Sequence, residues 1–163
     1  MTEPLFAVIC AAFVAVLALL AWLGWRSRRR SQNGIPAPAT PPADYRAEVE
    51  AEVFYVATTK ADDEYDRIAV HGLGLRTKSR LLVGEQGILL ETPERAVFTP
   101  RTDLLSVERA TWTIDRAVEP GGLLRYAWRL GDYELATNIR VIGDDETVLH
   151  AMQRLTEQEQ HID

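Results

Sequence analysis

Three basic side chains alternate with small polar ones in the sequence Arg76-Thr77-Lys78-Ser79-Arg80. On an extended strand, alternate residues point to the same face, so this spacing places three cations side by side. Such a row can bind the phosphate of an anionic lipid headgroup or another small anion. An ordinary solvated strand has the same pattern. The sequence therefore leaves two interpretations open: anion or lipid contact through Arg76, Lys78 and Arg80, or an exposed strand face.

A second candidate for ligand binding is the segment His71-Gly72-Leu73-Gly74, which follows Asp66-Arg67. Its glycines would allow a ligand to approach the backbone closely. A dinucleotide site needs a third glycine, but Thr77 stands in its place, and no strand-to-helix transition follows. We therefore expect a loop shaped by its glycines, with the histidine making a local hydrogen bond.

Other groups that could perform chemistry are few or badly spaced. The acidic residues before Arg67 lack the spacing of an EF-hand, and no two histidines have zinc-ligand spacing. The single cysteine, Cys10, lies inside an apolar run, and no nucleophile elbow is present. We predict no catalytic residue, no metal site, no cofactor and no enzyme activity. The residues considered are Asp62, Asp63, Glu64, Asp66, His71, His150 and His161.

The first quarter of the chain is dominated by an apolar run from Leu5 to Trp25 without a charged residue. A helix of this length spans about 31 Å, which matches the hydrocarbon thickness of a bilayer. A cleaved signal peptide would instead have a basic start, a shorter apolar region and small residues at a cleavage site. The sequence predicts an uncleaved transmembrane helix over residues 5–25, with residues 1–4 outside the cytoplasm.

The orientation of this helix follows from its flanks. Arg26, Arg28, Arg29 and Arg30 follow the apolar run, whereas the N-terminal side carries only Glu3. Positive charge is retained on the cytoplasmic side, so we expect the N-terminus outside the plasma membrane and the rest of the chain in the cytosol. Trp22 and Trp25 would lie at the membrane interface, where amphipathic rings are enriched.

Ala7, Ala11 and Ala15 are spaced four residues apart and share one face of the helix. Small residues at this spacing let membrane helices pack closely, so weak self-association is one interpretation. The other interpretation, which we favour, is that alanine is simply common in such helices.

Charge is divided unevenly along the chain. Residues 1–43 hold four arginines and one glutamate, a net charge of +3, whereas the whole chain carries −6, so the remainder carries −9. An acidic body excludes sequence-independent binding to nucleic acid, which requires a basic face. The partners that we expect are the lipid bilayer and a protein of unknown identity.

The segment between the apolar run and the body contains four prolines, Pro36, Pro38, Pro41 and Pro42. Proline lacks an N–H and fixes φ, so the segment should be an extended spacer rather than a helix or a paired strand. We therefore expect a basic and proline-rich linker over residues 26–44, a folded domain over 45–158 and a tail over 159–163.

The body is predicted to contain about seven strands followed by one helix. Apolar and polar residues alternate over 48–56, and a turn at 84–87 separates two short apolar runs. Asp144 can cap a helix in which Val148, Leu149, Met152 and Leu155 share one face. The fold class is mainly β, an antiparallel barrel or sandwich closed by the helix. The strands are expected at 48–56, 79–83, 88–91, 96–99, 104–114, 123–130 and 134–142, with a long loop over 61–74.

Four aromatic residues, Trp112, Tyr126, Trp128 and Tyr133, fall within the last strands and the turn between them. Aromatic side chains at these positions could line a groove for a peptide. They more commonly fill a core, and we expect Trp112 and Trp128 to be buried.

The segments 54–59, 66–74 and above all RATWTIDRAVEPGGLLRYAWRLGD at 109–132 resemble those of small bacterial membrane proteins with an N-terminal anchor and a pleckstrin-homology-like (PH-like) domain, typical of actinobacteria. The resemblance extends over nearly the whole chain and implies seven strands closed by a helix. Its members are commonly described only as membrane, export or transporter proteins, so it implies no catalytic residue. We interpret the protein as a membrane-anchored interaction or scaffolding module, with recognition of anionic lipid as the alternative.

Overall fold

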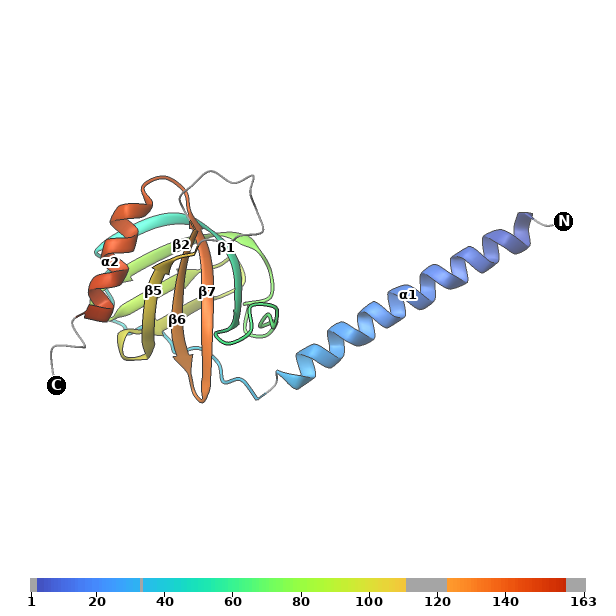
Figure 1. The fold of residues 1–163 in the computed structure, drawn as a ribbon, viewed down its shortest axis with the longest axis horizontal. Coiled ribbons are helices and arrows are strands. Elements are labelled where there is room, and N and C mark those ends of the chain that lie inside the picture. Colours follow the sequence, from blue (N-terminus) through green and yellow to red (C-terminus); the bar gives the residue numbers. More distant parts are fainter. Residues whose placement is uncertain (1–2, 33, 111–122, 158–163) are drawn as a thin grey trace. The chain divides into compact units, whose positions relative to one another are not determined.

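A computed structural model describes residues 3–32, 34–110 and 123–157 of the chain. The chain divides into two units, residues 1–34 and residues 35–163, and each is described by itself. The first unit consists of one helix, and the second contains a seven-stranded sheet and a second helix (Figure 1).

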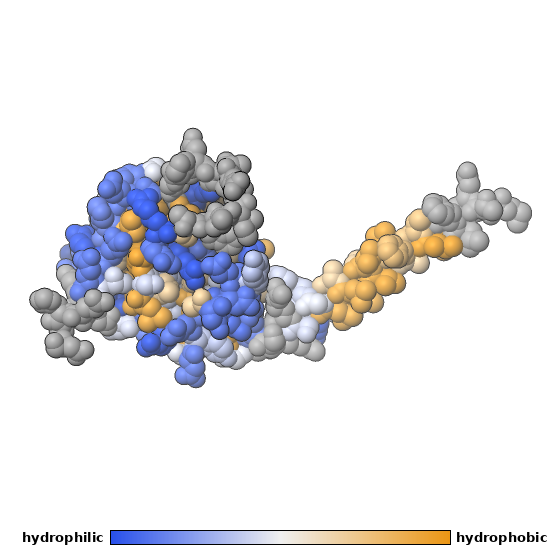
Figure 2. All heavy atoms as spheres, viewed as in Figure 1, coloured by the Kyte–Doolittle hydropathy of each residue, from blue (hydrophilic) through white to orange (hydrophobic). Residues whose placement is uncertain are grey.

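The first unit is the helix α1 (Glu3–Ser31). Its segment Ala7–Ser27 has a mean hydropathy of 2.6 and is long and apolar enough to cross a membrane, as the sequence predicted. Its side chains are largely exposed and apolar, in contrast to the mostly hydrophilic surface of the second unit (Figure 2). The Arg26 guanidinium lies 5.5 Å from the ring centre of Trp22, a distance suited to a cation–π contact.

Two further predictions concern α1: the arginines at its C-terminal end and the alanines on one of its faces. Arg28, Arg29 and Arg30 belong to the last turn of the helix, which therefore continues beyond the apolar run. The small-residue face of Ala7, Ala11 and Ala15 is exposed along the helix, and its self-association stays a prediction.

The second unit is built on one antiparallel sheet with the strand order β4-β3-β2-β1-β7-β6-β5. Alternating apolar residues explain most of these strands, because one side of the sheet faces the core. The strands are β1 (Val49–Lys60), β2 (Thr77–Gly84), β3 (Gly87–Glu91), β4 (Ala96–Pro100), β5 (Leu104–Arg109), β6 (Leu123–Leu130) and β7 (Tyr133–Val141), with a short 3₁₀ helix η1 (Arg101–Asp103) between β4 and β5.

The long strand β1 connects the two halves of the sheet. It pairs with β2 from Val49 to Tyr55 and with β7 from Val53 to Lys60. The sheet thereby folds around a core, with β5, β6 and β7 in front of β2, β3 and β4 in the view of Figure 1. The predicted mainly-β, sandwich-like fold with a C-terminal helix is confirmed.

The helix α2 (Asp145–Glu157) covers the core beside β5 and also contacts β1 and β2. Asp144 caps it, because its Oδ1 accepts hydrogen bonds from the backbone N–H groups of Glu146 and Thr147. The Thr147 hydroxyl donates to the same carboxylate, and these bonds lower the pKa of Asp144. The predicted apolar face is buried, with Val148, Leu149, Ala151, Met152 and Leu155 against the sheet.

The core contains a chain of hydrogen bonds among buried polar groups. Trp128 Nε1–H donates to Thr137 Oγ1 at 3.0 Å, and the hydroxyls of Thr137 and Thr58 lie 2.8 Å apart. The Tyr55 hydroxyl lies 3.0 Å from Thr58 Oγ1 and 2.7 Å from the Leu73 carbonyl oxygen. That carbonyl can only accept, so Tyr55 donates to it and Thr58 donates to Tyr55.

The residues before β1 pack against the domain instead of forming the separate spacer that the sequence predicted. Ile35 is only 3% exposed and belongs to the core, and Ala39 forms an antiparallel bridge with Phe98 of β4. The second unit therefore begins at Ile35 rather than at the expected Tyr45. Proline prevents regular pairing along this segment, but it does not prevent apolar side chains from packing on a sheet.

Tyr45 and Ala47 complete this packing by covering a small apolar cluster on the outer side of the sheet. The cluster consists of Leu82, Leu89 and Phe98, and the Tyr45 ring meets the Phe98 ring edge-on with centroids 5.5 Å apart. We call residues 35–47 the N-terminal strap.

The last expected strands agree with the structure apart from their ends. The strand predicted over 104–114 corresponds to β5, which ends at Arg109 in the part of the chain that the structure describes. Trp112, which was expected to be buried, lies outside the described residues. Trp128 and Tyr126 are each 1% exposed, as expected for core residues, and Tyr133 packs against the core while remaining partly exposed.

Candidate interaction surface

The predicted basic row lies on the outer face of the sheet, away from the core. Lys78 and Arg80 project from β2, and the exposed Arg76 directly precedes this strand. The antiparallel register places Arg80 opposite Glu52 and Lys78 opposite Phe54 of β1. The predicted common face therefore holds for Lys78 and Arg80, but their spacing could not identify their neighbours.

Two of the three cations are paired with carboxylates from the neighbouring strands. Lys78 Nζ lies 2.9 Å from Glu52 Oε2, and Arg80 Nη2 lies 2.5 Å from Glu50 Oε2. Arg80 Nη1 is also 3.8 Å from Glu91 Oε2 in β3. The hydrogen bond and charge of Glu50 raise the pKa of Arg80. The row is thus part of a ladder of alternating charge rather than an isolated positive strip.

Beside this ladder, two apolar side chains are exposed on the same face of β1 and β7. Phe54 is 44% exposed and lies opposite Arg140 in the register, while Ile142 is 41% exposed. The Ile142 N–H donates to the Glu52 carbonyl at 2.9 Å, so Ile142 continues the ladder past the end of β7. Nothing in the sequence alone distinguishes this pair, although Phe54 falls in phase with the outward Glu50 and Glu52.

A shallow hollow adjoins the exposed pair where β1 separates from β7. It has a volume of about 330 Å³ and is open to solvent. Its walls come from the start of β1, from the segment between β7 and α2, and from the first turn of α2. The lining residues are Val49, Glu50, Ala51, Glu52, Ile142, Asp144, Thr147 and Val148.

Comparison with known families agrees with this architecture. The family model described as bacterial PH domain-like matches residues 35–157, which is most of the chain. The chain belongs to this family. The match begins at the N-terminal strap and ends with α2, so it covers all of the second unit except residues 158–163. A search of the curated proteins found no match.

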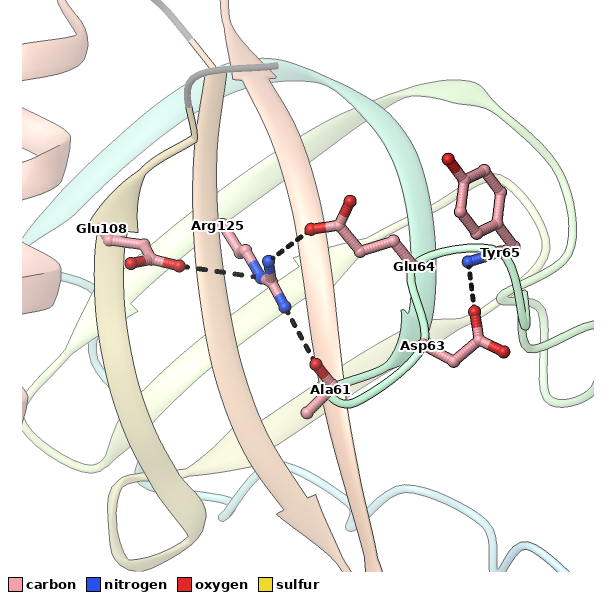
Figure 3. A network of polar contacts seen from close by, with 6 residues as sticks. All are labelled: Ala61, Asp63, Glu64, Tyr65, Glu108 and Arg125. Atoms are coloured by element: carbon pink, nitrogen blue, oxygen red, sulfur yellow. Dashed lines mark hydrogen bonds and ion pairs between the residues drawn. The ribbon is translucent and has the colours of Figure 1, made fainter. Parts of the chain in front are cut away.

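In this PH-like domain, the acidic loop after β1 is fastened to the outer face of the sheet (Figure 3). Arg125 of β6 donates through Nη1 to Glu64 Oε1 at 2.9 Å and through Nη2 to the Ala61 carbonyl at 3.2 Å. Its Nε is 3.8 Å from Glu108 Oε1 in β5. At the loop tip, the Tyr65 side chain is 79% exposed.

The acidic side chains of this loop therefore make structural contacts. Besides Glu64, Asp66 Oδ2 pairs with Lys60 Nζ at 2.7 Å, and Asp63 Oδ1 accepts from the Tyr65 N–H. The hydrogen bond to Asp66 raises the pKa of Lys60. Across the described part of the chain, no three His, Cys, Asp or Glu residues come together as a metal site.

The histidine of the glycine-containing loop has a longer-range role than expected. His71 has φ 57°, and Gly72 follows with φ 78°, so the backbone turns sharply at this point. The ring Nε2 of His71 lies 2.8 Å from the Ile35 carbonyl oxygen, 36 positions earlier in the sequence. The loop holds the start of the N-terminal strap, and its predicted local hydrogen bond is replaced by this contact.

Proposed function

We propose that the protein is a single-pass membrane adaptor whose PH-like domain binds a protein partner and holds it near the bilayer. The observation that carries this proposal is the exposed pair Phe54 and Ile142 on one face of the sheet. Apolar side chains that adjoin mixed charges are typical of a surface that binds another protein. The helix α1 supplies the means of anchoring.

The alternative proposal is recognition of anionic lipid or a small anion through Arg76, Lys78 and Arg80. Exposed Arg76 supports it. The carboxylates of Glu50, Glu52 and Glu91 oppose it, because they lie next to the other two cations and would repel a phosphate. We therefore favour a protein partner.

We further propose a non-catalytic role and a cytosolic domain. PH-like domains generally bind rather than catalyse. The four arginines at the C-terminal end of α1, set against one glutamate at the other end, favour retention of this side in the cytosol. The cation–π contact between Arg26 and Trp22 is consistent with an interface position for both side chains.

Photo-crosslinking in native membranes tests the adaptor proposal. A photoreactive residue at position 54 of the full chain should yield one dominant adduct with a protein in stoichiometric amount. The matched control is the same residue at Glu85, which is exposed in the β2–β3 turn, where no such adduct is expected. Adducts with lipid alone at position 54 would contradict the proposal and favour the lipid alternative.

A further inference from the structure

We propose that the hollow between the start of β1 and the first turn of α2 receives an extended peptide segment of a protein partner, in which basic and apolar residues alternate. This inference rests on the proposed adaptor function and assigns it a site and a class of ligand. Three features of the hollow support it: a strand edge that the described residues leave largely unpaired, an apolar wall and an acidic rim.

The edge that is largely unpaired within the described part of the chain belongs to the first four residues of β1. These residues pair with β2 from Val49, whereas pairing with β7 begins only at Val53. Among the described residues, the ladder toward β7 extends past Val53 by a single bond, from the Ile142 N–H to the Glu52 carbonyl. A peptide in extended conformation can add to such an edge through main-chain hydrogen bonds.

The apolar wall gives the site side-chain selectivity. Ile142 and Val49 line the hollow, and Phe54 lies two residues beyond Glu52 on the same face of β1. Alternate side chains of an added strand point to one face, so an apolar residue of the peptide would lie against Ile142 while its neighbours point elsewhere. The volume of about 330 Å³ is at the lower end of ligand pockets and suits one or two side chains.

The acidic rim specifies the charge of the segment. Glu50, Glu52 and Asp144 line the hollow. Glu50 and Glu52 are already paired with Arg80 and Lys78, but each carboxylate can accept further hydrogen bonds. The existing pairs are exposed, with relative exposures of 51–63%, so they are weak and a basic side chain of a partner can join or replace them.

The same rim argues against an anionic membrane surface as the occupant. A bilayer would bring phosphate groups toward three carboxylates at once, which is unfavourable at short range. A single peptide chain is narrow enough to place a cation at Glu50 and Glu52 while its backbone follows β1. The observations therefore favour a basic peptide over a lipid headgroup.

The test uses the full chain in neutral-lipid nanodiscs and two synthetic probes. One is a six-residue peptide that alternates lysine and valine, and the matched control alternates glutamate and valine. Backbone amide shifts of the isotopically labelled protein should change around residues 49–52, 142 and 147 with the basic probe only. Methylation of the amide nitrogens that face β1 should abolish these changes, because an added strand needs those N–H groups.

Three variants test which side chains of the hollow contribute to binding of the basic probe. The double variant Glu50→Gln and Glu52→Gln should weaken the basic probe about tenfold, a loss typical of removing charge pairs at a binding site. Glu91→Gln also removes a partner of Arg80 but lies outside the hollow, so it should leave the affinity unchanged. Ile142→Ala provides a second, charge-neutral test and should weaken the probe as well.

Three results would overturn the inference. The basic probe could bind the double variant as tightly as the unaltered protein, the amide shifts could be centred outside the hollow, or the acidic probe could bind as tightly as the basic one. Shifts produced instead by vesicles of anionic lipid would assign the hollow to headgroups. Failure here is distinguishable from failure of the adaptor proposal. If position 54 still crosslinks to a protein when Glu50 and Glu52 are replaced, the adaptor function holds and the hollow is not its site.

Discussion

Arg125 and Glu64 join two parts of the PH-like domain that lie 61 positions apart in the sequence, through a hydrogen bond of 2.9 Å between Nη1 and Oε1. The Arg125 side chain is only 20% exposed, and it also binds the Ala61 carbonyl. This side chain therefore ties the acidic loop to β6.

Replacement of Arg125 by alanine should detach the loop at residues 61–64. We expect a loss of about 1–2 kcal/mol in the free energy of unfolding, because hydrogen bonds to charged groups contribute about this much when one partner remains partly solvated. Hydrogen exchange of the full chain in detergent should become faster at residues 61–67. Arg125→Lys keeps the charge but not the forked geometry, and it should restore only part of the protection. Unchanged exchange in Arg125→Ala would contradict this role.

A second prediction concerns the buried hydroxyl of Thr137. Thr137→Val keeps the shape of the side chain but leaves the Trp128 N–H without its acceptor and removes one of the two hydroxyl contacts of Thr58, the other being with Tyr55. Denaturant unfolding should show a loss of about 1–3 kcal/mol, the cost of a buried unsatisfied group. The double variant Thr58→Val and Thr137→Val should lose less than the sum of the two single variants, because the contact between the hydroxyls is counted twice. Additive losses would indicate that the hydroxyls act independently.

Three tyrosines should make the domain sensitive to alkaline pH. Burial raises the pKa of Tyr45 and of Tyr55 to about 12, and it raises the pKa of Tyr126 further. Because the folded pKa exceeds the unfolded value of 10.0, stability is fully present below pH 10 and decreases as the pH rises toward 12. Phenolate absorbance should show these tyrosines ionising together with unfolding. Tyr55→Phe should reduce the steepness of this loss, and an unaltered profile would count against the assignment.

The N-terminal strap should contribute to stability. Tyr45→Ala removes the ring that covers Leu82, Leu89 and Phe98, and we expect unfolding to become about 2 kcal/mol easier, less than for a fully buried aromatic because Tyr45 is partly exposed. Tyr45→Phe keeps the ring and loses only the hydroxyl, which lies 2.9 Å from the Leu82 carbonyl oxygen and 3.2 Å from that of Gly87, so its loss should be smaller. Equal losses in the two variants would show that the ring does not act as a cover. Denaturant titration of the full chain in detergent measures both.

The orientation of α1 can be tested at single positions. Reversal of Arg28, Arg29 and Arg30 to glutamate should reduce the cytosolic activity of a reporter fused after Asp163 by at least about half, because the positive flank determines which side stays in the cytosol. Replacement of the same residues by lysine preserves the charge and should preserve the orientation. A reporter that is active only outside the cytosol in the unaltered protein would refute the proposed topology.

Most strands and the helix α2 were predictable, because the spacing of apolar residues that marks each element lies within that element's own sequence. The alternation in β1 and the apolar face of α2 follow directly from which side of an element faces the core. The strap was not predictable in the same way, since nothing in the sequence around it indicates that Ile35 will contact His71 or that Ala39 will pair with Phe98. Proline content correctly excluded a regular strand, but it carried no information about packing.

The candidate surface was likewise predictable only in part. The common face of Lys78 and Arg80 followed from their spacing, whereas their neutralisation by Glu52 and Glu50 depends on the register between β1 and β2. Register is a property of two strands together, and alternation within one strand cannot supply it. The exposed pair of Phe54 and Ile142 required the same information for β1 and β7.

The bridge between Ala39 and Phe98 bears on how copies of this protein would coexist in the proposed membrane-anchored form. The strand β4 is an outer strand of the sheet, and a bare outer strand offers its backbone to any similar strand nearby. The proposed anchoring would confine copies to two dimensions, where encounters between them are frequent. Because the strap occupies part of this edge within the same chain, we expect it to reduce aggregation of the protein with its own copies.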